Sequence, residues 1–480
     1  MDGSRILSQA TAHAVAFLKG LAHRDVGATA RAGELRDSLE RSLPELGTRA
    51  EQVLDELVHD VEGGIVASTG PRFFGWVMGG ALPVALAADW LTSTWDQNAA
   101  VYATSPAEAL IEEVTGGWLK ELLGLPPQAS FAFVTGCQMA HTTALAAARH
   151  RLLSDRDWNV ETKGQAGAPP LRILTSEDRH ASINRAVRLL GLGTDAIEPL
   201  SCDEKGRIQL AALEDALQKS PSRPTVLCLQ AGELNTGAYD RFRQACTIAH
   251  AARAWVHVDG AFGLWAAASE KYRHLTDGVE LADSWAADGH KWLNVPYDSG
   301  FVFVADPAAH QAVFAEQTGH ASPTASGAQD TRNQMDWNPE WSRRGRAVPV
   351  YAAIRTLGRS GIAEIVERNC AHATRLVNEI GNLPGAEILA EPIINQGLVR
   401  FRAANSDHDG DHDAHTDRVI ARIQSDGVAW FGPVTWCGKR AMRISLSNWR
   451  TTDADIDLTV ASIKAALAHC DWVQGSPPGF

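Results

Sequence analysis

The spacing of apolar residues divides the chain into three parts. In residues 1–70, apolar side chains recur at helical spacing within Ala10–Leu21 and Val53–Val61, and Pro44 lies between them. Between about 90 and 305, short apolar or β-branched runs alternate with helical segments such as Ala140–Leu152 and Ile183–Leu190. The short runs are Phe131–Val134, Arg172–Leu174, Thr225–Leu229, Ala254–Val258 and Gly300–Val304. This alternation predicts a mostly parallel sheet with helices on both faces.

The pattern changes again from about residue 345. Val350–Leu357 and Ile362–Ile380 have helical periodicity, and a strand at Leu398–Phe401, a helix at Thr416–Ser425 and a strand at Met442–Leu446 follow. We therefore expect an α/β protein in three parts. These are an N-terminal helical segment (1–89), a large α/β domain (90–345) and a smaller C-terminal α+β domain (346–480).

Two polar stretches interrupt this pattern. Ser154–Pro170 is predicted to be a loop or short insertion, and Asn405–Asp417 (NSDHDGDHDAHTD) is dense in aspartate and histidine. The glycine of the second stretch stands too early for a calcium loop, and no acidic residue closes it at the required distance. A solvated connection before a helix is favoured over a metal loop, so no metal site is expected.

Composition narrows the class of protein. The 44 basic and 57 acidic residues give a net charge of −13, which argues against binding to nucleic acid or to an anionic membrane surface. Phe73–Ala88, the longest uncharged apolar stretch, is shorter than the about 20 residues that span a bilayer. Seven scattered cysteines without a C-x-x-C pair, and no secretory signal pattern, predict a soluble cytoplasmic enzyme.

The segment WAADGHKWLNVPYDSG (Trp285–Gly300) carries the first chemical signal. Lys291 follows His290 in a loop between two strand-like runs, among apolar neighbours where a structural charge would be costly. Such a lysine is either turned to solvent or is a reactive amine, because desolvation lowers a lysine pKa and favours Schiff-base chemistry.

A carboxylate stands one predicted strand earlier, in AWVHVDGAFG (Ala254–Gly263). Asp259 is expected at the carboxyl end of its strand, where ligands bind in parallel α/β sheets, although it could instead cap the next helix. An acid that protonates a pyridine nitrogen and a lysine that holds an aldehyde are what pyridoxal phosphate requires. The pair therefore predicts this cofactor.

Two further segments fit the same ligand. His180 precedes a predicted helix, and with Lys291 and Asp259 present we interpret it as stacking on the cofactor ring. VTGCQMA (Val134–Ala140) leads from a strand into a helix whose free N–H groups would hold a phosphate, although an ordinary strand–helix turn has the same pattern.

In this order and spacing, the segments resemble the group II pyridoxal-phosphate-dependent amino-acid decarboxylases. This family includes the aromatic-L-amino-acid, histidine, tyrosine, glutamate and 2,4-diaminobutyrate decarboxylases. The resemblance extends over nearly the whole chain and includes Pro71–Val77, Glu233–Asp240, Ser342–Gly358 and Arg443–Asp457. It implies the aspartate-aminotransferase-like fold of type I pyridoxal phosphate enzymes, and a homodimer formed through the N-terminal segment with both subunits contributing to each site.

The resemblance also implies residue roles. Lys291 would form the Schiff base, His180 would stack on the ring, Asp259 would pair with the pyridine nitrogen and Ala261 would pack on the other face. Thr236 would lie near the 3-oxygen of the ring. Gly136, Cys137 and Gln138 match the phosphate turn, and His290 and Asp288 adjoin it, although Asp288 replaces an asparagine of some relatives. The candidate substrate residues are Phe73, Phe74, Trp76, Trp95 and Arg443; Arg443 could equally be a surface charge at a strand end.

One departure from the family concerns proton delivery. In the aromatic decarboxylases a mobile loop after the lysine carries a tyrosine that protonates the substrate carbon after CO₂ leaves. The five tyrosines here are Tyr102, Tyr239, Tyr272, Tyr297 and Tyr351, so none lies between 305 and 341. His320 stands near the expected place and could donate the proton, or it could be a solvent-exposed loop residue.

The expected reaction is decarboxylation of an L-amino acid, aromatic or bulky, to the amine and CO₂ through a quinonoid intermediate. Three other reactions on the same fold stay open: an oxygen-dependent aldehyde synthase, a carbon–carbon lyase and an aminotransferase. A non-enzymatic ligand-binding relative is disfavoured because Lys291 and Asp259 are both present.

Overall fold

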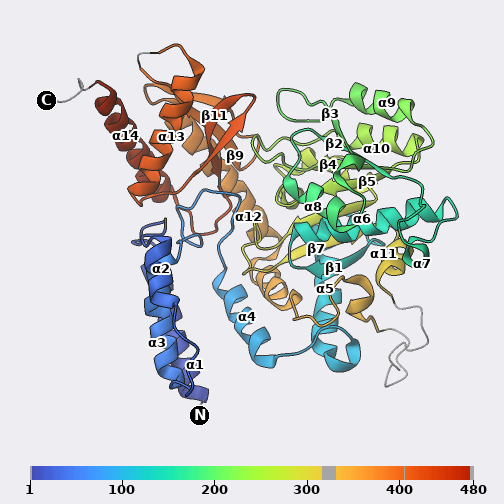
Figure 1. Ribbon diagram of the computed structural model, residues 1–480, viewed down its shortest axis with the longest axis horizontal. Coiled ribbons are helices and arrows are strands. Elements are labelled where there is room, and N and C mark those ends of the chain that lie inside the picture. The colour runs from blue at the N-terminus through green and yellow to red at the C-terminus, as the bar shows by residue number, and fades with distance from the viewer. Residues whose placement is uncertain (1–2, 316–330, 405, 476–480) are drawn as a thin grey trace. The chain divides into compact units, whose positions relative to one another are not determined.

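A computed structural model describes residues 3–315, 331–404 and 406–475 (Figure 1). Contacts within the chain define two compact units, and each is described by itself. The larger unit comprises residues 79–374 and 390–397, and the smaller unit comprises residues 1–78, 375–389 and 398–480. We expected domain boundaries after residues 89 and 345, and the two contact-based units divide the chain elsewhere. The expected boundaries refer to folding domains, so they stay predictions.

A seven-stranded sheet forms the centre of the larger unit. Its order is β1-β7-β6-β5-β4-β2-β3, and only β7 runs antiparallel to its neighbours. The strands are β1 (Ser130–Val134), β2 (Arg172–Ser176), β3 (Ile197–Leu200), β4 (Thr225–Gln230), β5 (Trp255–Asp259), β6 (Ser284–Asp288) and β7 (Gly300–Val304). The predicted mostly parallel sheet is confirmed, with β3 and β6 in addition to the predicted strands.

Both faces of this sheet are covered. Ala132, Val226 and Val302 belong to a buried cluster with helices α6 and α8, whereas the alternate residues Phe133 and Leu227 point to the opposite face and are equally buried. Figure 1 shows α6 lying along the sheet, and this helix packs on β5, β6 and β7. The helices of this unit are α4 (Pro83–Trp95), α5 (Pro106–Leu122), α6 (Cys137–Ser154), α7 (Val160–Lys163), α8 (Ala181–Leu189), α9 (Leu210–Lys219), α10 (Phe242–Ala251) and α11 (Pro307–Phe314).

The smaller unit contains the N-terminal helices and a second sheet. The helices α1 (Gly3–Gly20), α2 (Ala32–Leu39) and α3 (Ala50–Val61) contain no buried residue. The second sheet has the order β10-β11-β9-β8. Its strands are β8 (Ala386–Ala390), β9 (Gln396–Phe401), β10 (Gly432–Trp436) and β11 (Lys439–Ser445), and helices α13 (Asp409–Ser425) and α14 (Asp453–Gly475) follow β9 and β11 in the chain. The predicted C-terminal mixture of helices and strands is confirmed.

The chain passes from the larger to the smaller unit along α12 (Ala347–Gly381). Gly358 interrupts this helix with φ of 61° and ψ of −175°, a backbone conformation that glycine adopts without a Cβ penalty. The sequence predicts two helices on either side of this glycine, and the structure places them end to end.

The segment Pro71–Met78 is tied into the smaller unit. The backbone of Phe73 bridges to Trp430, and the two rings stack with centroids 4.9 Å apart. Arg72 forms a buried ion pair with Asp455 at 2.9 Å. Residues before position 79 and residues after position 429 therefore share one core.

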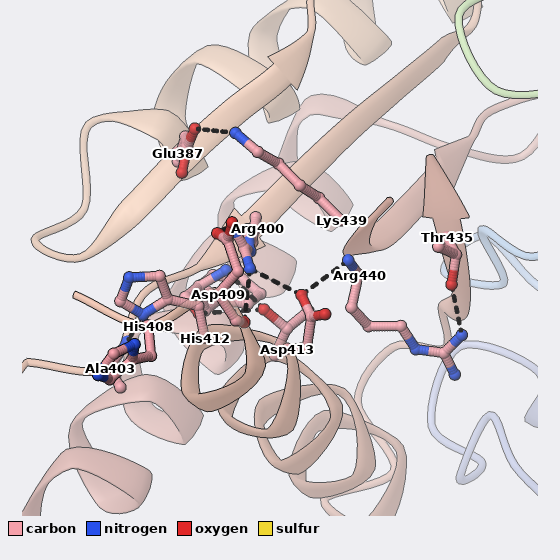
Figure 2. Close-up of polar contacts among 12 residues, drawn as sticks. Glu387, Arg400, Ala403, His408, Asp409, His412, Asp413, Thr435, Lys439 and Arg440 are labelled. Carbon is pink, nitrogen blue, oxygen red and sulfur yellow. Dashed lines mark hydrogen bonds and ion pairs between the residues drawn. The ribbon is translucent and has the colours of Figure 1, made fainter. Parts of the chain in front are cut away.

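The aspartate- and histidine-rich stretch is largely helical. We expected a solvated connection over Asn405–Asp417, but α13 begins at Asp409, and Asn405 lies outside the described residues. Arg400, buried on β9, donates to Asp409 Oδ1 and Asp413 Oδ1, each at 2.7 Å, and to the Asp409 carbonyl at 2.8 Å (Figure 2). We call Arg400, Asp409 and Asp413 the Arg400 cluster; it fastens the first turn of α13 to the sheet.

In the described part of the chain, no helix has both the length and the apolar character needed to cross a bilayer.

Candidate active site

The site lies at the carboxyl ends of two neighbouring parallel strands. Asp259 is the last residue of β5 and Asp288 is the last residue of β6, and the two strands pair with Asp259 opposite Ala286. The chain leaves the sheet at this edge, so the side chains that follow both strands converge there. The predicted position of Asp259 at a strand end is confirmed.

Lys291 lies in the turn between β6 and β7 and faces a carboxylate. Its Nζ is 3.2 Å from Asp288 Oδ2, and His290 Nε2 is 3.5 Å from the same oxygen. Burial lowers the pKa of Lys291, as the sequence suggests, but the Asp288 carboxylate, helped by Asp259, outweighs burial and raises it. The net direction is therefore upward.

The N-terminus of α6 borders the same carboxylate. Gly136 is the N-cap residue, and the Cys137 N–H donates to Asp288 Oδ1 at 2.7 Å. We expected free N–H groups at this helix start, and the structure bonds one of them, that of Cys137, to Asp288. The Gln138 Nε2 is buried without a hydrogen-bond partner among the described residues. Burial raises the pKa of the Cys137 thiol, so this side chain stays protonated.

Asp259 is held as an anion. His141 Nε2 lies 3.4 Å from Asp259 Oδ2, and the Ala261 N–H donates to Oδ1 at 3.2 Å. Burial would raise the pKa of Asp259, but His141, His180 and Lys291 together lower it. The carboxylate is therefore suited to stabilise a cationic partner.

His180 and Thr236 have defined partners. His180 is the N-cap of α8, and its Nδ1 accepts from the Ser182 N–H at 3.2 Å and lies 2.7 Å from the Ser182 hydroxyl oxygen. The Thr236 hydroxyl donates to the Lys205 carbonyl at 2.7 Å and lies 3.1 Å from Glu233 Oε2. The hydroxyl proton of Thr236 is thus already in use, and its predicted place near the ring stays a prediction.

The candidate substrate residues are divided between the two units. Trp95 ends α4 in the larger unit, with its ring partly exposed. In the smaller unit, Phe74 is buried 5.2 Å from the Phe431 ring, Trp76 is exposed, and Arg443 is buried within β11. The alternative that Arg443 is a surface charge is therefore wrong. His320 lies outside the described residues, so its role stays a prediction.

Four further residues belong to the surroundings of the site. His141 on α6 contacts His257 on β5, which contacts Ser284 on β6, and Tyr297 stacks on His290 with ring centroids 4.2 Å apart. The sequence contains one signal for this group: His257 and Asp259 occupy alternate positions of one strand and so share a face. His141 lies in an alanine-rich helix that offers no comparable pattern.

The residues present fit pyridoxal phosphate. A lysine amine and an ionised carboxylate at the neighbouring strand end are the groups that this cofactor requires, and a histidine precedes α8. The unpartnered Gln138 amide is a hydrogen-bond donor beside the N-terminus of α6. A Cβ added to Gly136 would approach His290 Cε1 to 3.1 Å, so the turn is open only because residue 136 is glycine.

Comparisons with known proteins agree with this site. Residues 32–404 match the model of the pyridoxal-dependent decarboxylase conserved domain. The aromatic-L-amino-acid decarboxylase of Bacillus atrophaeus is 27% identical over 455 residues, which are 93% of this chain and 91% of that protein.

Solved structures share the fold. The crystal structure of Oryza sativa TDC with PLP and tryptamine has a TM-score of 0.91 and 22% identity, and covers 98% of both chains. Rhodiola rosea 4-hydroxyphenylacetaldehyde synthase has a TM-score of 0.87 and 21% identity, over 98% of this chain and 99% of that one. The predicted fold is confirmed, and the chain belongs to the pyridoxal-dependent decarboxylase family, as a carboxy-lyase that uses pyridoxal phosphate.

Proposed function

We propose that this enzyme removes CO₂ from an L-amino acid, preferably an aromatic or bulky one, and releases the amine. The observation that carries the proposal is the pair of strand ends. Lys291 stands beside Asp288 after β6, and the ionised Asp259 ends the neighbouring β5. An amine and an anion at one edge of the sheet can hold the two ends of a pyridoxal ring.

The chain's own residues would divide the work as follows. Bound pyridoxal phosphate supplies an electron-accepting ring that stabilises negative charge on the substrate α-carbon. Asp259 would keep a proton on the ring nitrogen, while His180 and Ala261 would cover the ring faces and Thr236 would lie near its 3-oxygen. The phosphate would be held by Gly136, Cys137, Gln138 and His290, and Asp288, which replaces an asparagine of some relatives, would stand beside it.

Lys291 must lose a proton before its amine can act as a nucleophile. Asp288 Oδ2, 3.2 Å from Lys291 Nζ, stabilises the protonated amine and so opposes this loss. His290 Nε2 lies 3.5 Å from that oxygen, and burial lowers the pKa of His290, so this ring adds no competing charge at neutral pH. Asp288 would therefore control the protonation of Lys291.

Two features support an aromatic substrate. Trp95 and Trp76 are exposed tryptophans, and aromatic rings favour offset or edge-on packing with an aromatic side chain. The Bacillus atrophaeus relative is an aromatic-L-amino-acid decarboxylase. The test is incubation of the enzyme with all twenty amino acids, followed by mass spectrometry of amines and aldehydes. Turnover of glutamate alone would contradict the aromatic preference and would point to Arg443 as a carboxylate partner.

An oxidative outcome is the second candidate. No tyrosine lies between residues 305 and 341, and the structural relative from Rhodiola rosea is an aldehyde synthase. If His320 supplies the proton to the α-carbon, His320→Ala should slow amine release by about 10²–10⁴-fold. Uptake of one O₂ per CO₂, measured with an oxygen electrode, would instead establish the aldehyde reaction and overturn simple decarboxylation.

We also propose that the enzyme is a cytoplasmic homodimer that assembles through its N-terminal helices. Leu7 and Val15 of α1 and Val53 and Leu57 of α3 are exposed, although amphipathic helices normally bury their apolar faces. Light scattering should give twice the mass of 51.6 kDa, and Leu57→Glu should reduce it. A wild-type monomer would contradict the proposal. The cytoplasmic location rests on the seven cysteines, all of them free thiols.

A further inference from the structure

A chain of buried polar side chains leads away from Asp259 into the core of the larger unit. His141 Nδ1 lies 2.9 Å from His257 Nε2, and His257 Nδ1 lies 3.0 Å from Ser284 Oγ. The Trp255 Nε1–H donates to the same hydroxyl oxygen at 2.9 Å. Both imidazoles and the serine have no exposed side-chain surface, so this chain is sealed from water.

The groups at the two ends of this hydrogen-bonded series, Trp255 and Asp259, determine which atom donates in each hydrogen bond. An indole N–H can only donate, and an ionised carboxylate can only accept. Burial lowers the pKa of His257 to about 3, so this ring is neutral. If His141 also carries a single proton, each contact has one donor only when Ser284 donates to His257 and His257 Nε2–H donates to His141 Nδ1. The remaining proton then lies on His141 Nε2, the atom 3.4 Å from Asp259.

We propose that His141 is a positioning residue for the cofactor, which holds the Asp259 carboxylate in place through its Nε2–H, and that His257 and Ser284 set the tautomer of His141. This inference rests on the proposed pairing of Asp259 with the pyridine nitrogen. The His141 Nε2 has no hydrogen bond among the described residues, and 3.4 Å is long for one. Such contacts commonly tighten when a site fills, and a bond to a carboxylate is among the stronger kinds.

The position of these hydrogen-bonded side chains on β5 and α6 explains how they reach Asp259. His257 and Asp259 share the face of β5 that lies against α6, and His141 reaches both from the second turn of that helix. The other groups whose charge lowers the pKa of Asp259 are His180 ahead of α8 and Lys291 of the turn; the thiols of Cys137 on α6 and Cys228 on β4, whose pKa values Asp259 raises, are neutral. His141 joins Asp259 to the hydrogen-bonded series that ends in the donor-only indole of Trp255.

The test is equilibrium binding of pyridoxal phosphate to the apoprotein, followed by its absorption bands between pH 5 and 9. We expect His141→Leu to weaken binding by about 10–100-fold, as for loss of a hydrogen bond to a charged group. The weakening should grow as the pH falls, because Asp259 without its donor takes up a proton more easily. His141→Gln, which retains an N–H near the position of Nε2, should recover most of the affinity, and Ser284→Ala should cause a smaller loss in the same direction.

His310 provides the matched control. It is an equally buried histidine on α11, bonded to Ser130 and to the Trp337 carbonyl, and it does not contact Asp259. His310→Leu should lower stability without moving the affinity or the absorption bands. Equal spectra for wild type and His141→Leu, or the same shift in both leucine variants, would overturn the inference.

Two further outcomes distinguish failure of the role of His141 from failure of the proposed pairing between Asp259 and the pyridine nitrogen. If Asp259→Asn leaves cofactor binding and spectrum unchanged, the proposed pairing itself fails. If Asp259→Asn changes them and His141→Leu does not, only the role of His141 fails. Because Cys137, His141 and Asp259 offer metal-ligating atoms within 4.8 Å of one another, stoichiometric zinc lost in His141→Leu would also overturn the inference.

Discussion

Two shielded cations that face carboxylates, Lys291 in the larger unit and Arg400 in the smaller unit, differ in chemistry. In the larger unit, Lys291 lies 3.2 Å from Asp288, which is itself buried. In the smaller unit, Arg400 lies 2.7 Å from Asp409 and Asp413, whose side chains reach water. A guanidinium keeps its proton and binds carboxylates as a rigid fork, whereas an ammonium can give its proton to a neighbour.

The comparison shows that a buried charge does not by itself mark a reactive site. Arg400 donates to two carboxylates and a carbonyl and fastens the start of α13 (Figure 2). Arg400 also keeps one buried donor without a hydrogen bond, its Nε, whereas at Lys291 such donors belong to neighbouring side chains, Gln138 Nε2 and His141 Nε2. A titratable amine at the ends of parallel strands, rather than an unused donor alone, separates the ligand site from the structural ion pair.

Replacing Lys291 by arginine would exchange a reactive amine for a guanidinium like that of Arg400. We expect this change to have the largest effect on turnover. Lys291→Arg keeps the charge beside Asp288 but removes the primary amine, so turnover should fall to background while the protein stays folded. Borohydride should fix the cofactor to the tryptic peptide containing Lys291 in the wild type and to no peptide in the variant. Labelling of any other lysine would contradict the assignment. Lys439→Arg, in the smaller unit, is the matched control and should leave turnover unchanged.

Asp259→Asn removes the second charge that distinguishes the site. The amide cannot stabilise a protonated ring nitrogen, so kcat should fall by about 10²–10³-fold, the range seen when one preorganised electrostatic group is lost. Near-normal kcat would show that the carboxylate only caps its turn. Asp277→Asn, on an exposed aspartate paired with Arg243, should leave kcat unchanged.

Acid should unfold the larger unit through its neutral buried histidines rather than through ion pairs. Burial lowers the pKa of His257 and His310 to about 3, whereas an unfolded histidine titrates near 6.5. Between these values the unfolded chain binds more protons, so the free energy of unfolding falls as the pH drops. Each histidine contributes about 1.4 kcal/mol per pH unit. In denaturation series from pH 6.5 to 4.5, His310→Leu should reduce the slope of unfolding free energy against pH by about 1.4 kcal/mol per pH unit. The same change at the exposed His274 should leave this slope unchanged.

The smallest effect is expected for the reverse exchange in the Arg400 cluster. Arg400→Lys keeps the positive charge but loses the forked contacts to Asp409 and Asp413, so the free energy of unfolding should fall by about 1–2 kcal/mol. Turnover per folded molecule should not change. Arg5→Lys, at an exposed pair, should leave the thermal midpoint unchanged. A loss of kcat in Arg400→Lys would contradict the structural role given to the cluster.

The sequence predicted the parts of the fold whose apolar pattern is strong. β7 occupies the predicted residues Gly300–Val304, and α6 and α8 contain or overlap the predicted helices. β3 was not predicted because its sequence, Ile-Glu-Pro-Leu, forms a partly exposed edge strand. β6 was missed because Ser-Trp-Ala-Ala-Asp contains no β-branched residue, although the sheet buries it completely.

Some features of the site could likewise be predicted from the sequence and others could not. Asp259 could be found because it ends a recognisable apolar run, and Lys291 because it stands in a loop among apolar neighbours where a structural charge would be costly. The raised pKa of Lys291 could not be foreseen, because it depends on Asp288 facing the amine after the turn has formed. The contact between His141 and His257 joins residues 116 positions apart, and no local pattern encodes such a contact.

The single reversed strand of the large sheet has a consequence for how the enzyme matures. Because β7 runs back beside β6, residues 289–299 need only close a short loop between adjacent strands, and the Gly289 and His290 N–H groups already donate to the Ser299 carbonyl. Closing so short a loop costs little chain entropy. The newly folded chain therefore presents Lys291 before any cofactor arrives, and added pyridoxal phosphate should activate the apoenzyme without a lag for refolding.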